Sequence, residues 1–186
     1  MRPQLVVLLS SILLLASCEK EVRLSAGAVE DRSGTPVLDT RQVTTLISDS
    51  GIIRYRILTD VWQIYDKAEP DYWEFPKGIY LERFNEELSV DASLHADYAI
   101  YYRQDQLWRL DGNVHALNLE GEEFVTEQLF WDQRTEKIYT DSLITITKTS
   151  SVIAGIGFVS NQSMSQYTIL HPTGYFPIED EEEKDE

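Results

Sequence analysis

The chain has 186 residues, of which 42% are hydrophobic, and a formal net charge of −16 at pH 7. This length suffices for one domain with its own hydrophobic core. No Lys/Arg cluster is interleaved with aromatic residues in this acidic chain, so we expect no nucleic-acid partner. The only cysteine, Cys18, excludes an internal disulfide and a zinc site built on several cysteines.

The N-terminal residues predict export and a lipid anchor. Arg2 precedes an apolar stretch, Leu5 to Ala16, that is interrupted only by two serines. It is too short to span a membrane as a helix and suits the apolar region of a signal peptide. It ends in Leu15-Ala16-Ser17-Cys18, which resembles a bacterial lipobox. We expect residues 1–17 to be a lipoprotein signal peptide and Cys18 to carry the anchor. The alternative is a chance cysteine near an ordinary secretory cleavage site.

The next segment, residues 18–41, is predicted to be a tether, because it has little periodicity and contains Gly, Ser and Pro. From 42 to 172, short segments rich in Ile, Val, Thr, Tyr and Trp alternate with turn residues. The spacing of roughly 8–12 residues predicts an all-β sandwich, barrel or roll. Turns are predicted at 49–51, 111–113 and 120–121.

Several of these segments alternate between apolar and polar residues, which predicts one face on an apolar interior and one in water. Ile144 and Ile146, for example, alternate with threonines. The predicted inward residues are Ile53, Tyr55, Trp108, Leu110, Val114, Ile138, Ile144 and Ile146. The four tryptophans are interpreted as core residues, as walls of an open interior, or as both.

A weak internal repeat supports the same interior. Ala96–Tyr101 resembles Thr126–Trp131 thirty positions later, and at this offset Trp108 meets Ile138 and Val114 meets Ile144. A fainter third copy aligns Phe158 with Phe130. Repeats of this size predict stacked pairs of strands. Such a roll has two open ends, each a sheet edge that another chain can pair with.

Two stretches do not fit the alternating pattern. Asp71–Pro76 is predicted to be a loop that covers one end of the roll. Gly155-Ile156-Gly157 has the first two glycines of a dinucleotide-binding fingerprint but no third glycine and no following helix. A β-bulge or a close approach of two backbones is therefore predicted there.

Ala96–Tyr102, Asp111–Val114, Thr126–Asp132 and Gly155–Phe158, in this order and spacing, resemble the repeats of the LptC/LptA (OstA-like) proteins. The resemblance covers roughly residues 44–170 and agrees best with LptC. It implies an open, twisted β-jellyroll, or β-roll of repeated strand pairs. In such a fold the inward residues named above would line a groove for lipopolysaccharide acyl chains.

The resemblance also implies partners. The chain would accept lipopolysaccharide from an inner-membrane ABC transporter of the LptBFG kind and pass it to an LptA-like periplasmic protein by strand addition. It departs from the familiar LptC in its predicted anchor, a lipidated Cys18 instead of a transmembrane helix. We expect a periplasmic lipoprotein, with the inner membrane favoured.

No catalytic motif is found, and the three histidines lack metal-ligand spacing, so we expect no enzyme activity, no cofactor and no metal. The alternative function is a lipoprotein β-sandwich that binds glycan or protein partners through exposed aromatics. A hydrolase ranks last. Residues 173–186, which end in seven acids and one lysine, are predicted to be a disordered tail.

Overall fold

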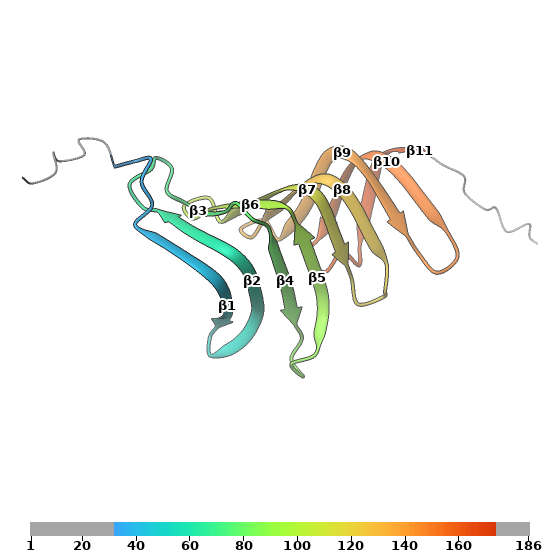
Figure 1. Cartoon of the computed structure of the whole chain (residues 1–186). Coiled ribbons are helices and arrows are strands. Elements are labelled where there is room, and N and C mark those ends of the chain that lie inside the picture. Colours follow the sequence, from blue (N-terminus) through green and yellow to red (C-terminus); the bar gives the residue numbers. More distant parts are fainter. Residues whose placement is uncertain (1–31, 174–186) are drawn as a thin grey trace, which may run out of the picture. The chain divides into compact units, whose positions relative to one another are not determined.

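The computed structural model describes residues 32–173, which form eleven strands of one antiparallel sheet (Figure 1). The all-β prediction is confirmed. None of the described residues belongs to a helix that could cross a membrane. The strands are β1 Leu38–Asp49, β2 Ile52–Tyr65, β3 Tyr72–Phe75, β4 Ile79–Phe84, β5 Val90–Ala96, β6 Tyr98–Tyr102, β7 Leu107–Leu117, β8 Glu123–Asp132, β9 Lys137–Thr147, β10 Val152–Asn161 and β11 Tyr167–Thr173.

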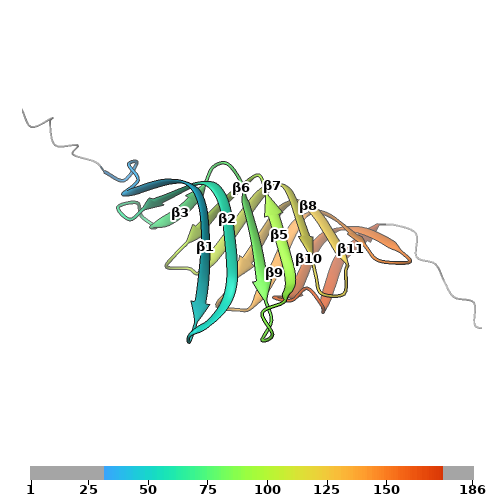
Figure 2. The same cartoon turned by 60° about the horizontal axis from the view of Figure 1, so that its bottom comes forward.

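The sheet is folded into two layers that share their long strands. β2 pairs with β4 through Tyr55–Leu58 and with β3 through Gln63–Tyr65. β7 likewise pairs with β6 through Leu107–Asp111 and with β5 through His115–Leu117. We call the layer with β4 and β5 the first layer and the layer with β3 and β6 the second layer. Figures 1 and 2 show β1 and β2 curving from one layer into the other.

Buried threonines lie where the long strands turn from one layer to the other. Thr59 Oγ1 donates to the Gly78 carbonyl at 2.7 Å, and Thr126 Oγ1 donates to the Leu143 carbonyl at 2.8 Å. Thr140 Oγ1 accepts the N–H of the residue two places ahead at 3.1 Å. A bent strand leaves ladder groups without partners, and a hydroxyl on a β-branched side chain can bond them without leaving the sheet.

In β7 and β10, residues with positive φ lie where these strands bend from one layer to the other. Gly112 (φ 76°) and Asn113 (φ 45°) lie inside β7, where its register with β8 shifts. The prediction of a turn at 111–113 is therefore wrong, because the left-handed residues form a bulge within a continuous strand. Gly157 (φ 82°) lies at a register shift between β10 and β9, as the bulge prediction expected.

Two other boundaries differ from the sequence predictions. The predicted loop at Asp71–Pro76 contains β3, which pairs with β2 and β6. Its alternation was obscured because Tyr72, on the outward face, is also aromatic and stacks on Tyr65 at 4.7 Å. At the N-terminal side, β1 begins at Leu38, so 38–41, expected in the tether, pair with β2.

Candidate functional site

The two layers meet through one buried apolar cluster. It contains six of the eight predicted inward residues: Trp108, Leu110, Val114, Ile138, Ile144 and Ile146. Tyr55 packs against the cluster, whereas Ile53 is half-buried and lies outside it. The burial of the six cluster residues and the packing of Tyr55 agree with the alternation, whereas the predicted inward orientation of Ile53 is not seen in the cluster. The role of all eight in lining a lipid groove stays a prediction.

The second layer presents a continuous line of rings to the first. Trp62, Trp73, Tyr101, Trp108 and Trp131 come from β2, β3, β6, β7 and β8, and successive ring centroids are 5.0, 5.2, 4.7 and 6.4 Å apart. We call these five residues the aromatic row. Such spacings are those of interacting aromatic pairs. Only Trp108 among them was predicted to face inward from the sequence, and the alternation of Trp73 with Glu74 could have identified a second member.

The first layer faces the aromatic row with smaller side chains. They are Ile57, Ile79, Leu81, Leu94, Val114, Ala116, Ile144 and Ile146, all buried. Tyr55 reaches from this layer to Trp131, with ring centroids 5.4 Å apart, and burial raises the pKa of the Tyr55 hydroxyl. The space between the layers is thus bounded by an aliphatic wall and an aromatic wall.

A small apolar cavity lies between these walls, bordered by Tyr55, Leu94, Trp131, Ile138 and Met164 among others. Its volume is about 30 Å³, far too small for an acyl chain. The walls are in contact beside it, through the rings of Tyr55 and Trp131. A lipid chain could therefore enter this part of the interior only if the layers moved apart.

Side chains at the tips of the strands join the layers near β7–β11. Asn118, after β7, donates from Nδ2 to the Met164 carbonyl in the β10–β11 turn at 3.1 Å. Lys148 Nζ lies 2.8 Å from Glu122 Oε1 and 5.1 Å from the centroid of the Tyr167 ring. The hydrogen bond to Glu122 raises the pKa of Lys148. We call these five residues the clasp. Because Asn118 and Met164 are 46 positions apart, no local pattern could have predicted their contact.

The sheet has two free edges within residues 32–173. β1 pairs only with β2, and β11 pairs only with β10. Figures 1 and 2 place these strands at opposite ends of the sheet. Each pairs on both sides of the bend, so both layers reach both edges. Unpaired strand edges are templates for pairing with another chain.

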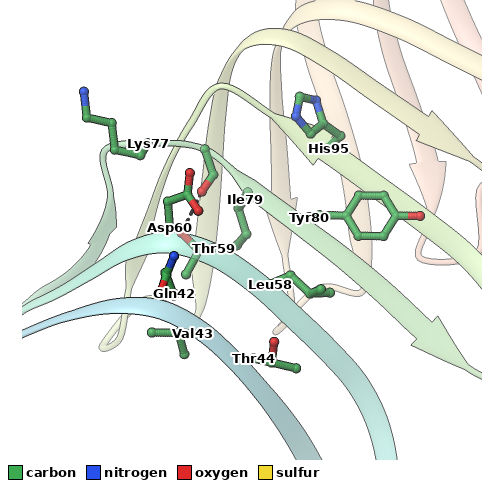
Figure 3. Close-up of a pocket in the computed structure, with 11 residues that line it drawn as sticks. Gln42, Val43, Thr44, Leu58, Thr59, Asp60, Lys77, Ile79, Tyr80 and His95 are labelled. Carbon is green, nitrogen blue, oxygen red and sulfur yellow. Dashed lines mark hydrogen bonds between the residues drawn. The ribbon is translucent and has the colours of Figure 1, made fainter.

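The outward surface near β1, β2 and β4 carries a pocket of about 430 Å³ (Figure 3). Its acidic and basic lining residues are Asp60, Lys77 and His95, and Lys77 extends away from the other labelled side chains. These three described residues form no ion pair with one another. Across residues 32–173, no three His, Cys, Asp or Glu side chains gather as a metal site requires. The pocket therefore offers no convergent chemistry.

Comparison with known proteins agrees with the fold. The sequence model of the family described as "LptC: Lipopolysaccharide-assembly, LptC-related" matches residues 4–174, which is most of the chain. No curated protein matches. The chain therefore belongs to the LptC-related family of lipopolysaccharide assembly, and it takes part in lipopolysaccharide transport.

Proposed function

We propose that the protein carries lipopolysaccharide between the two layers of its sheet, accepting it from an inner-membrane ABC transporter and passing it to an LptA-like periplasmic protein. The observation that supports this best is the apolar interior bounded by the aromatic row and the aliphatic first layer. Acyl chains need a continuous apolar wall, and their burial is favourable by about 0.8 kcal/mol per CH₂. The layers part to admit them.

The two free edges support the proposed partners. A strand of the transporter at one edge and a strand of the LptA-like protein at the other would extend both layers without a break. Main-chain hydrogen bonds would supply affinity in such β-augmentation, whatever the side chains. The interior would then continue from one protein into the next.

The anchor and the compartment are part of the same proposal. Residues 1–17 would be removed as a signal peptide, and lipidated Cys18 would hold the protein at the periplasmic side of the inner membrane, with residues up to the start of β1 as tether. Residues 1–31 and 174–186, including Cys18 and the acidic tail, lie outside the described residues. Cys18→Ala should abolish labelling by radioactive palmitate; normal labelling of this variant would contradict the anchor.

Two neighbouring tyrosines of β6 give a matched test of lipid carriage. Tyr101 belongs to the aromatic row, whereas Tyr102 faces outward beside Tyr72, with ring centroids 6.5 Å apart. p-Benzoylphenylalanine can replace either tyrosine, with its photoreactive benzoyl group attached where tyrosine has the hydroxyl. In living cells, the photoreactive residue at 101 should capture lipopolysaccharide and the one at 102 should not. Capture at 102 alone would show that the lipid lies on the outward face of the second layer. Capture at neither position would refute lipid carriage.

A further inference from the structure

Three tryptophans of the aromatic row carry buried hydrogen-bond donors that have no acceptor. The indole Nε1 atoms of Trp62, Trp108 and Trp131 are buried, and no acceptor among residues 32–173 bonds them. Trp108 and Trp131 are themselves 3% and 7% exposed. Buried donors are nearly always paired in proteins, and one left unpaired costs about 1–3 kcal/mol. Three on one wall therefore require an explanation.

Aromatic bulk alone does not explain them. Phe75, Phe124 and Phe158 fill the same interior with rings that have no polar atom, and each is at most 2% exposed. Phe75 even lies between Trp62 and Trp108, with ring centroids 5.7 and 5.6 Å away. Phenylalanine would thus serve packing at these positions without leaving a donor unpaired.

The rings of two of these tryptophans lie together in the interior between the layers. Trp108 and Trp131 are directly opposite each other on β7 and β8, and their rings are nearly parallel at 16°. Trp131 borders the small cavity together with Tyr55 and Met164. That cavity is lined almost entirely by apolar groups, so it offers few partners to an ordered water.

We propose that the indole N–H groups of Trp108 and Trp131, with Trp62 further along the row, donate hydrogen bonds to oxygen atoms at the heads of acyl chains. The ligand class is an acylated lipid, whose ester or amide carbonyl lies next to each hydrocarbon chain. The inference rests on the proposed carriage of lipid between the layers and adds what it recognises: carbonyl oxygens as well as hydrocarbon. A carbonyl brought into this dry interior would satisfy a donor that is otherwise unpaired.

The test compares two lipids that differ only in these oxygens. The full chain is titrated with dihexanoyl phosphatidylcholine and with its dihexyl ether analogue, both below their micelle concentrations, and dissociation constants are measured by calorimetry. The wild type should bind the ester roughly three- to tenfold more tightly than the ether, the ratio that one hydrogen bond supplies. A wild type that binds both equally, or neither, overturns the inference.

Variants assign the preference to the indoles. In Trp108→Phe and Trp131→Phe the ester-to-ether ratio should fall towards one, whereas Trp73→Phe, whose Nε1 is not among the unpaired donors, should keep it. A general loss of packing weakens both lipids alike and leaves the ratio unchanged, so an unchanged ratio in both variants refutes the proposal. If a variant fails to fold, benzothienylalanine at 108 or 131 replaces N–H by sulfur in the same shape. Capture of lipopolysaccharide at position 101 is scored separately and decides lipid carriage itself.

Discussion

Two neighbouring aliphatic side chains of β9 face opposite ways, which permits a sharp test of the interior. Ile144 is fully buried, whereas Leu143 is 58% exposed. Ile144→Ala should lower the free energy of unfolding by about 2–5 kcal/mol, because it removes buried methyl groups and leaves a cavity. Leu143→Ala should change it by less than about 0.5 kcal/mol. Urea unfolding measures both; equal losses would show that the assignment of faces is wrong.

Charged substitutions at Ile144 and at its neighbour Thr145 extend the comparison of the two faces of β9. Ile144→Asp should prevent folding or cost several kcal/mol, because its carboxylate would be buried without a partner. Thr145→Asp, next along the strand and half-buried on the other face, should leave the domain folded with a cooperative urea transition. A folded Ile144→Asp protein with wild-type stability would show that the layers do not close over this residue.

At the scale of single elements, Gly155 controls how β11 joins the sheet. A Cβ at this position would lie 2.3 Å from Cγ2 of Ile169 and 2.7 Å from the carbonyl oxygen of His171. Gly155→Ala should therefore push β11 away from β10, and hydrogen exchange of the β11 amides should accelerate while β7 and β8 stay protected. The control is Gly34→Ala, where no atom lies within 4 Å of the new Cβ. Unchanged exchange in β11 would contradict this close approach.

The clasp should respond to alkaline pH through Lys148. The pKa of this side chain is raised above its ordinary value of 10.5, because its ammonium bonds the Glu122 carboxylate. A raised pKa contributes stability that is complete below the pKa of the unfolded chain and is lost as pH rises through the folded value. The wild type should exceed Lys148→Met in stability by less than about 1 kcal/mol, since the pair is partly exposed. This difference should be constant from pH 7 to 9 and shrink above about pH 10.5.

A second lysine separates this effect from general alkaline unfolding. Lys137 is exposed at the start of β9 and forms no ion pair with any described residue. Lys137→Met should therefore follow the wild type at every pH, because titration of the tyrosines is common to both proteins. A difference between wild type and Lys148→Met that persists unchanged beyond pH 11.5 would show that the pair does not stabilise the clasp.

The sequence predicted the elements better than the way they bend. Alternation and the thirty-residue offset identified β7 and β9 as equivalent strands, and Trp108 and Ile138, like Val114 and Ile144, are indeed buried. The alignment of Phe158 with Phe130 is wrong, because Phe158 is buried whereas Phe130 stacks outward on Tyr139 at 5.2 Å. The bulge at Gly157 shifts the register by one residue, and one residue exchanges the two faces of a strand.

Contacts between elements that are distant in the chain could not be predicted from local sequence patterns. The aromatic row depends on how five strands align, and the clasp joins the tips of three separate connections. Neither periodicity nor turn chemistry contains that information, since both report only on neighbours in the chain. The unpaired indole donors likewise became visible only when burial and hydrogen bonds were known together.

At the scale of the whole sheet, the bend does two things at once. It closes the inward faces on each other, which supplies the core that a single-layer sheet would lack. It also leaves the backbone of β1 and β11 unpaired at the two ends, where both layers stop together. The same geometry therefore stabilises the domain and provides two places where a partner could continue it.

Three exposed leucines test whether the partners join at these ends. Leu46 lies on β1 and Leu170 on β11, whereas Leu143 lies on β9 within the sheet; their exposed fractions are 54%, 55% and 58%. A photoreactive amino acid is placed at each position in turn, and crosslinking is carried out in living cells. The three sites are about equally exposed but differ in their distance from a free edge. Positions 46 and 170 should capture proteins, and the two captured proteins should differ, because each edge would meet another partner. Position 143 should capture little. Strand addition at the edges would be refuted if position 143 captured the same proteins as strongly, or if positions 46 and 170 captured none. Lipid carriage would not be affected by either result, because it is tested separately from position 101.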